Sequence, residues 1–331
     1  MNNSSSLLLP QKERIPVWSR KKRVIVLAGP TASSKTELSL LLAQAIGGEI
    51  ISADSMQVYR GLDIGTAKAT PEERALISHH MIDICDVEET YNVAQYYREA
   101  TQAVREVIAR DNVPIIAGGS GFYIHALLYG PPAGPPPIPE VREQLEKQIA
   151  ELGVEVLYER LQMLDPEYAA TISEHDQHKI VRALEIMALS EKRVSDFPKA
   201  ADKEEREFDF RCWFIYYPRE KLYGRIEMRC EEMIRKGFLD EVMEMESKGL
   251  RLNSSASQAI GYRQALQFLD SKRTSEDKEL FLAQFKKASR HYAKRQFTWF
   301  RKEPLFRWLN IEELDLDRIK EMILQDYEQG D

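Results

Sequence analysis

Eight consecutive residues, Gly29-Pro30-Thr31-Ala32-Ser33-Ser34-Lys35-Thr36, have the types and spacing needed to bind phosphate groups. They follow a short apolar run (24–29) and precede a run with helical spacing (36–47), so they are predicted to join a buried strand to a helix. Such a loop points backbone N–H groups at phosphate oxygens, aided by the helix dipole. Lys35 adds a charge for a terminal phosphate, and the Thr36 hydroxyl can hold Mg²⁺. We therefore predict that all eight bind a diphosphate or a nucleotide.

Ser34 departs from the usual phosphate-loop pattern, which has glycine before the lysine. If this position needs a positive φ, serine costs on the order of 1 kcal/mol. The alternative is an ordinary strand–helix turn, but the intact Lys35-Thr36 pair favours a phosphate site. The loop alone fits a P-loop kinase or ATPase as well as any other enzyme of a di- or triphosphate.

Asp54 is the second candidate for chemistry, because it ends another expected strand (48–54). Ligands of open α/β folds bind where the parallel strands end. A carboxylate there can act as a general base, hold a water bound to Mg²⁺, or cap the following turn. Spacing alone leaves these three roles open.

The elements that must position these residues alternate between strand and helix. Further strands are expected at 81–85, 113–119 and 212–217, with helical segments between the early ones. This order predicts an α/β fold whose parallel sheet resembles that of P-loop NTPases, with helices on both faces.

A proline-rich segment (131–139) cannot continue a helix or a central strand and marks a boundary. The pattern is then helical to about residue 189, with an apolar stripe of Val141, Leu145, Ile149 and Leu152, and a charged return follows at 201–207. We predict a flexible N-terminal tail (1–20), a core made of 21–138 and 210–331 with C-terminal helices, and a helical insert (139–209).

Composition narrows the class of protein. The net charge is −7, so a polyanion would have to be held by local basic patches. The three cysteines lie far apart, which argues against zinc and fits a cytoplasmic location, and no apolar run is long enough to span a membrane. His79, His80 and His125 are expected to have structural roles rather than to bind metal.

Several motifs, taken in order, resemble the bacterial type of the tRNA dimethylallyltransferase (tRNA isopentenyltransferase) family. Besides the phosphate loop they are ISADSMQVYRGLDIGTAK (51–68), HHMIDI (79–84), AGGSGFYIHALLYG (117–130), AIGYRQ (259–264) and AKRQFTWFR (293–301). The resemblance covers about residues 23–308. It implies that the phosphate loop binds dimethylallyl diphosphate with Mg²⁺, and that the dimethylallyl group moves to N6 of the adenosine 3′ to the anticodon.

The resemblance also implies roles for single residues. Asp54 would be the general base and Ser120 would help to place the adenine amine. Lys35 and Arg225 would stabilise the diphosphate, although Arg229, one helical turn later, could replace Arg225 in that role.

The expected partner is the anticodon stem-loop of a tRNA, and the expected state is a monomer. A helix is expected at 279–302, with Phe281, Phe285, Ala288, Tyr292 and Trp299 on a core face and Lys287, Arg290, Lys294 and Arg301 on a basic face. The residues expected to contact tRNA are Asp54, Ser55, Met56, Gln57, Ser120, Arg142, His178, Lys179, Arg182, Gln258, Gly261, Tyr262, Arg263, Lys294, Arg295 and Gln296.

Three other functions remain compatible with parts of this pattern. A P-loop small-molecule kinase or ATPase would share the phosphate loop. A prenyltransferase of free adenine nucleotides would share the catalytic residues without needing the insert. A non-catalytic RNA-binding module would have a phosphate loop impaired by Ser34.

Overall fold

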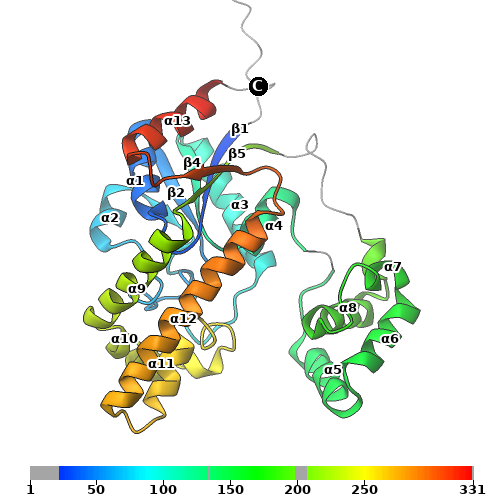
Figure 1. The fold of residues 1–331 in the computed structure, drawn as a ribbon. Helices are drawn as coiled ribbons and strands as arrows, with labels where there is room; N and C mark the ends of the chain where they lie inside the picture. Colours follow the sequence, from blue (N-terminus) through cyan, green and yellow to red (C-terminus); the bar gives the residue numbers. More distant parts are fainter. Residues whose placement is uncertain (1–21, 133, 198–206, 330–331) are drawn as a thin grey trace, which may run out of the picture.

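A six-stranded parallel sheet forms the centre of the protein (Figure 1), as the computed structural model describes it for residues 22–132, 134–197 and 207–329. The strand order is β3-β2-β4-β1-β5-β6 and every recorded pair is parallel. The α/β fold class is therefore confirmed. The expected tail (1–20) and most of the charged return lie outside the described residues. The strands are β1 (Lys22–Ala28), β2 (Gly48–Ala53), β3 (His79–His80), β4 (Val113–Gly118), β5 (Phe208–Tyr216) and β6 (Arg307–Asn310).

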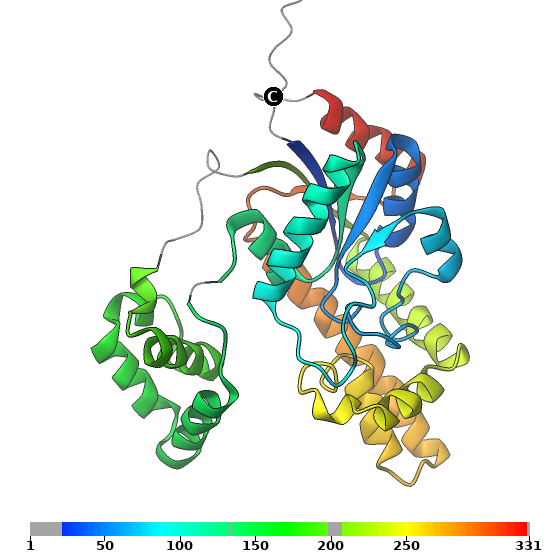
Figure 2. The same cartoon turned by 180° about the vertical axis from the view of Figure 1, so that it is seen from behind.

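Helices cover both faces of the sheet. On one face, α1 (Lys35–Ile46) and α13 (Leu316–Gln329) share a hydrophobic cluster with Ile25 and Leu27 of β1. On the other, α3 (Val93–Ala109) and α4 (Gly121–Tyr129) share a cluster with Val24 and Val26. This alternation along β1 is that of a strand buried on both sides. Figure 2 shows α3 in front of the sheet.

A second group of helices packs where the phosphate loop and the loop after β2 emerge from the sheet. Its four helices are α9 (Arg219–Arg235), α10 (Phe238–Ser247), α11 (Tyr262–Leu269) and α12 (Ser275–Phe300), and α2 (Pro71–Leu76) lies near β3. Phe238, Tyr262, Phe281 and Phe285 are buried together in their core. Thr274 begins α12 with a capping box, in which its hydroxyl accepts from the Asp277 N–H.

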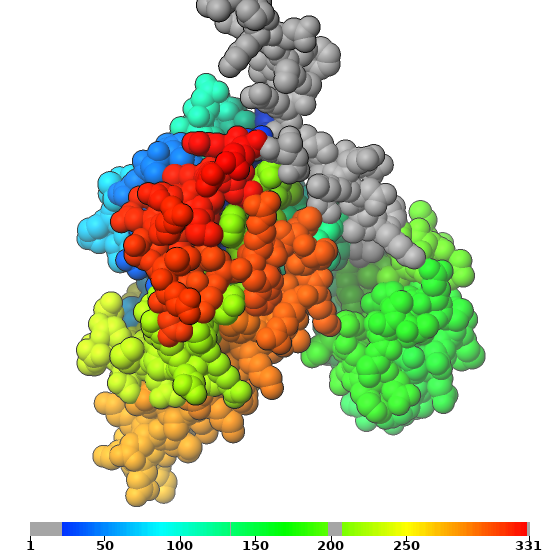
Figure 3. Space-filling model, turned by 45° about the horizontal axis from the view of Figure 1, so that its top comes forward, coloured from blue at the N-terminus to red at the C-terminus, as the bar shows by residue number. Residues whose placement is uncertain are grey.

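The expected helical segment after the proline-rich stretch consists of four helices with a hydrophobic cluster of their own. They are α5 (Pro139–Leu152), α6 (Val154–Leu164), α7 (Pro166–Ala169) and α8 (Gln177–Ser190), followed by a short 3-10 turn (Val194–Asp196). In Figures 1 and 3 these helices project to one side of the sheet and α12. Leu145 is buried among them, but Leu152 is 57% exposed and so lies outside the expected apolar stripe.

The strand expected at 81–85 is wrong. The strand β3 contains only His79 and His80, because Met81 (φ 62°) and Asp83 (φ 55°) adopt left-handed conformations that a strand cannot include. Lys68 and Arg74 both bind the Asp83 carboxylate and hold this bend. Cys85 forms only an isolated bridge to Tyr59.

The expected core face of α12 is also partly wrong. Trp299 is 41% exposed, whereas Ser289, Ala293, Gln296 and Phe300 are buried. The three cysteines, all within the described residues, are buried and form no disulfide bond. Among the residues described, no helix is both long and apolar enough to cross a membrane.

Candidate active site

The phosphate loop lies between β1 and α1, as the sequence indicated. Gly29 approaches the backbone so closely that a Cβ there would lie 2.4 Å from the Ile215 carbonyl oxygen. Ala32 (φ 64°) and Ser34 (φ 60°) both take the left-handed conformation. Position 34 therefore does require a positive φ, and Ser34 carries the expected backbone strain.

Arg225 of α9 holds the strained part of this loop. Its Nε donates to the Ala32 carbonyl oxygen at 2.9 Å, and its Nη2 donates to Ser34 Oγ at 2.9 Å. The Ser34 hydroxyl thus makes a charge-assisted hydrogen bond that glycine could not make.

Lys35 and Arg229 supply the other positive charges beside the loop. Lys35 Nζ donates to the Pro30 carbonyl oxygen at 2.6 Å. Burial, and next the charge of Arg229, lower the pKa of Lys35 from 10.5 to about 7, while the charge of Asp54 acts in the opposite direction. Arg229 lies one helical turn beyond Arg225 on α9. The site is therefore rich in positive charge that a phosphate would neutralise.

Asp54 and Ser120 follow the neighbouring strands β2 and β4, whose ends Ala53 and Gly118 are in register. Asp54 Oδ1 accepts from the Met56 N–H at 2.9 Å. Ser120 is 9% exposed, and its Oγ accepts from the Ser55 N–H at 2.9 Å. The two loops are therefore tied together, and Asp54 is held by its own turn.

Two cavities meet at Asp54. The first, which we call the P-loop cavity, has a volume of about 520 Å³ and is lined by the phosphate loop, Gln57, Arg225 and Arg229. The second, the helical cavity, has a volume of about 320 Å³ and is lined by α9, α12 and the residues before α11. Both volumes suit small ligands or parts of larger ones. The residues that line both cavities are Thr31, Asp54, Thr66, Arg229 and Tyr292.

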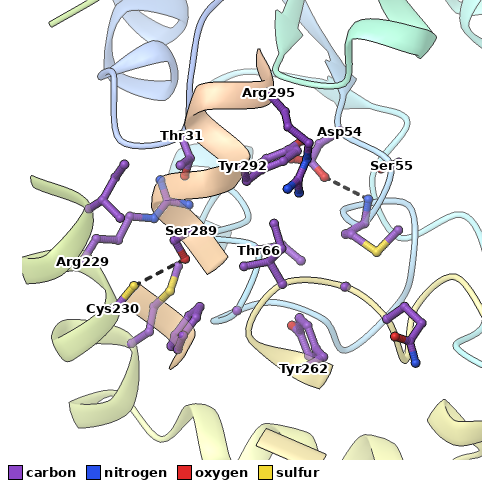
Figure 4. A pocket seen from close by; sticks show the side chains of 18 of the residues that line it. Thr31, Asp54, Ser55, Thr66, Arg229, Cys230, Tyr262, Ser289, Tyr292 and Arg295 are labelled. Atoms are coloured by element: carbon purple, nitrogen blue, oxygen red, sulfur yellow. Dashed lines mark hydrogen bonds between the residues drawn. The ribbon is translucent and has the colours of Figure 1, made fainter. Parts of the chain in front are cut away.

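The helical cavity is seen in Figure 4, where Asp54, Tyr292 and Arg295 lie close together and Arg229 approaches from α9. Burial, and next the charge of Asp54, raise the pKa of the Tyr292 phenol well above its ordinary value. Arg295 lies over the Tyr292 ring, with its guanidinium carbon 5.6 Å from the ring centre. The sequence placed Tyr292 on the core face of its helix, but the structure places it beside the candidate base.

Gln296 connects the two loops from α12. Its Oε1 accepts from the Thr31 N–H at 2.9 Å, and its Nε2 donates to the Gly119 carbonyl oxygen at 3.0 Å. The side chain is buried. In this structure the amide thus fixes the phosphate loop against the loop after β4, and its expected contact with tRNA stays a prediction.

Glu241 is a site residue that the sequence reasoning missed. Its carboxylate accepts from the N–H groups of Asp63, Ile64 and Gly65, and from the Tyr262 hydroxyl at 2.6 Å. This loop carries Gly65 and Thr66 into the helical cavity. The motif at 51–68 was noticed, but nothing local in the sequence connects it to α10.

The other expected tRNA contacts in the core lie at or near the helical cavity. Ser55, Met56 and Gln258 line it, while Gln57 lines the P-loop cavity. Tyr262 also lines the helical cavity, although its side chain is buried. Gly261 has a positive φ (91°) and lies against Phe285. Three cationic residues, Arg263, Lys294 and Arg295, are exposed.

The expected tRNA contacts in the insert are not brought to the two cavities. Arg142 pairs with Glu146 near the start of α5, and Lys179 pairs with Asp176 at the start of α8. His178 is exposed. Arg182 binds the buried Glu185 carboxylate and the Pro135 carbonyl oxygen. Arg182 thus joins the proline-rich segment before α5 to α8, so part of its role is structural.

His79, His80 and His125 have ordinary partners. His80 Nε2 lies 2.6 Å from Glu49 Oε2, His79 Nδ1 lies 2.8 Å from the Ile77 carbonyl oxygen, and His125 Nδ1 lies 2.8 Å from Glu303 Oε1. Within the described part of the chain, no group of three or more His, Cys, Asp or Glu side chains could hold a metal ion.

Comparison with known proteins identifies the family. A family model described as IPP transferase matches residues 57–303. The chain is 60% identical over 308 residues to a tRNA dimethylallyltransferase of Protochlamydia amoebophila (strain UWE25), covering 93% of this chain and 90% of the relative. It is 47% identical over 319 residues to a tRNA dimethylallyltransferase of Chlamydia pneumoniae, covering 96% and 93%.

Two solved structures are similar over nearly the whole chain. A tRNA isopentenylpyrophosphate transferase from Bacillus halodurans has a TM-score of 0.68 and 34% identity, covering 94% of this chain and 98% of that one. A eukaryotic dimethylallyltransferase acting on tRNA has a TM-score of 0.74 and 27% identity, covering 92% and 77%. The resemblance carried by the sequence motifs is confirmed, and the chain belongs to the IPP transferase family, as a prenyltransferase of the tRNA dimethylallyltransferase type.

Proposed function

We propose that this enzyme transfers the dimethylallyl group of dimethylallyl diphosphate to N6 of the adenosine 3′ to the anticodon in tRNA. The observation that carries the proposal is the position of Asp54, which lines both the P-loop cavity and the helical cavity. A donor diphosphate in the first cavity and an adenine in the second would meet at this carboxylate.

The P-loop cavity has the groups needed to stabilise a departing diphosphate. As the allylic C–O bond breaks, negative charge grows on the diphosphate oxygens, where backbone N–H groups, Lys35 and Arg229 stabilise it. Arg225 already binds Ala32 and Ser34, so we assign it the role of shaping the loop. We assign to Arg229 the role of binding the diphosphate oxygens directly.

A magnesium ion fits the donor atoms beside the loop. Mg²⁺ usually keeps several waters and is bound through few protein oxygens together with substrate phosphates. The Thr36 side chain is exposed and lines the P-loop cavity, so its hydroxyl would be the protein ligand. When bound, the ion would neutralise part of the diphosphate charge.

Asp54 would accept the proton that N6 loses. The exocyclic amine of adenine is a weak nucleophile, because its lone pair is delocalised into the ring, and a carboxylate that takes its proton as the C–N bond forms assists the reaction. Ser120 would act mainly by holding the Ser55 N–H and thus the turn that carries Asp54. The target base must leave its stack to reach this carboxylate.

One assay separates the competing functions. The full chain is incubated with labelled dimethylallyl diphosphate and Mg²⁺, with either unmodified tRNA or AMP as acceptor, and ATP hydrolysis is measured in parallel. We expect label in tRNA alone. Label in AMP would instead support a prenyltransferase of free nucleotides. ATP hydrolysis without label transfer would support a kinase or ATPase, and no turnover of either kind would leave an RNA-binding module.

A further inference from the structure

Some basic side chains of α12 pair with carboxylates of a neighbouring helix, and others do not. Lys286 pairs with Glu231 and Arg290 pairs with Glu227, both on α9. The sequence placed Arg290 on the same basic face as Lys287, but in the described part of the chain only Arg290 of the two has a recorded carboxylate partner. Lys287 and His291 are one helical turn apart and exposed, and neither has a recorded hydrogen bond or ion pair within the described residues. These two side chains therefore form a separate face, on which no carboxylate is recorded as a partner within the described residues.

Lys287 and His291 line a groove between α11 and α12. One hollow of about 470 Å³ also contains Arg263, Gln258, Gln267 and Gln284. A second hollow of about 390 Å³ shares Gln258, Arg263 and Gln267 with the first and extends the groove. Gln258 also lines the helical cavity, so the groove begins at the rim of the candidate active site.

The chemistry of the first hollow selects for a phosphodiester. None of its described lining residues is acidic, although the protein as a whole carries a net charge of −7; the second hollow includes Asp270, which pairs with Arg251. Gln258, Gln267 and Gln284 are exposed, and no side-chain hydrogen bond is recorded for them in the part of the chain that the structure describes. Cations attract phosphate oxygens, and free amides can bind either phosphate oxygens or ribose hydroxyls.

We propose that this groove, defined by Arg263, Lys287, His291, Gln258, Gln267 and Gln284, binds the RNA backbone beside the nucleotide whose base enters the helical cavity. The inference rests on the proposed tRNA substrate and adds a backbone subsite to it. Arg263 and Gln258 were expected to contact tRNA from sequence, whereas Lys287, His291, Gln267 and Gln284 enter only through the shape of the groove. Because Lys287 and His291 line neither of the two cavities that meet at Asp54, they should contribute to binding and not to the chemical step.

The test compares two variants of the full chain. One changes the side of α12 that faces the groove, and the other changes the side that faces α9. Lys287→Gln/His291→Gln removes the Lys287 charge and the His291 ring from the groove and leaves Arg263 in place, and Lys286→Gln removes a neighbouring cation that already has a protein partner. Binding of an unmodified tRNA is measured at several salt concentrations, together with kcat and KM for prenyl transfer. For the groove variant we expect the Kd and KM for tRNA to rise about 3- to 10-fold. We also expect the slope of log Kd against log salt to fall by about 0.7 for each lost contact, with kcat unchanged.

The control and the wild type make the outcomes distinct. Lys286→Gln should keep the wild-type Kd and salt slope. If the wild type modifies tRNA but the groove variant matches it in Kd and slope, the groove proposal is wrong while the proposed function stands. If the wild type modifies no tRNA at all, the proposed function fails first. Thermal unfolding of both variants shows whether a loss of binding reflects a loss of folding.

Discussion

The candidate site residues of the core are held in a different way from Arg142 and Lys179 of the insert. In the core, distant parts of the chain converge: Arg225 binds Ser34, and Gln296 binds the backbone of Thr31. In the insert, Arg142 and Lys179 bind carboxylates only three or four residues away. Folding thus brings the residues of the reaction centre together. The cations of the insert have only weak partners within the protein, and the phosphates of a bound tRNA would be stronger ones.

This contrast has an energetic side. Exposed ion pairs within a helix contribute only about 0.3–0.5 kcal/mol each, so a phosphate group could replace the partner at little cost. The charge-assisted hydrogen bonds that hold the phosphate loop contribute more, about 1.5–3 kcal/mol each. Changes in the core should therefore alter chemistry and stability, and changes in the insert should alter only affinity for RNA.

The largest effect on substrate affinity is expected at Lys35. Lys35→Met should raise the KM for dimethylallyl diphosphate about 10- to 100-fold, because one charged hydrogen-bond donor to phosphate is lost. In the wild type the pKa of Lys35 is lowered to about 7, so the charged form of the free enzyme becomes scarcer as the pH rises above 7. The KM should then rise up to about tenfold per pH unit, whereas Lys35→Arg should show a flatter profile because a guanidinium stays charged.

The same lowered pKa predicts the direction of a stability change without ligand. Between about pH 7 and the unfolded value of 10.5, the unfolded chain binds the Lys35 proton more strongly than the folded chain. The contribution of this group to the free energy of unfolding should therefore rise with pH across that window. For the prediction on binding, a wild-type KM for dimethylallyl diphosphate that is constant from pH 6 to 9 would contradict the role of Lys35.

A smaller effect, on stability, is expected for Ser34 and Arg225. In an Arg225→Met background, Ser34→Gly should stabilise the protein by about 1 kcal/mol, because only backbone strain is then relieved. In the wild-type background this gain should be cancelled or reversed, since the hydrogen bond to Arg225 is lost as well. Urea unfolding of the four proteins gives the coupling energy. Purely additive effects would show that the serine hydroxyl does not compensate for its conformation.

The smallest effect is expected in the insert. Lys179→Gln should raise the KM for tRNA about two- to threefold without changing kcat, because it removes one exposed phosphate contact. Lys147→Gln is a matched control, since Lys147 is exposed and pairs with Glu143 on the same bundle but is not among the expected tRNA contacts. Equal KM values for the two variants would remove Lys179 from the RNA-binding surface.

The parts of the site that sequence could predict are local. The strand, loop and helix around Gly29 and Lys35 are specified by neighbouring residues, and so is the place of Asp54 after β2. The failure at 81–85 is also local in origin, because an apolar run does not reveal the left-handed backbone of Met81 and Asp83. The two cavities and their junction depend on how helices pack, and no run of residues encodes that.

The residues that sequence missed are joined to the site across long stretches of chain. Glu241 reaches the loop at 63–65 from α10, and Tyr292 reaches Asp54 from α12. Helical spacing correctly predicted the helix α12. It could not show whether a given apolar or aromatic side chain of that helix lines a cavity or packs in the core. For the same reason Arg290 was expected on the basic face of the helix, although Glu227 of α9 pairs with it.

Asp54→Asn tests the central claim most directly. Asparagine keeps the shape of the side chain and can still accept from the Met56 N–H, but it cannot take a proton. In a single turnover with preformed complexes of enzyme, dimethylallyl diphosphate and tRNA, we predict a rate at least about 100-fold lower than that of the wild type. The Kd for tRNA should stay within about twofold. A transfer rate equal to that of the wild type would show that this carboxylate is not the base.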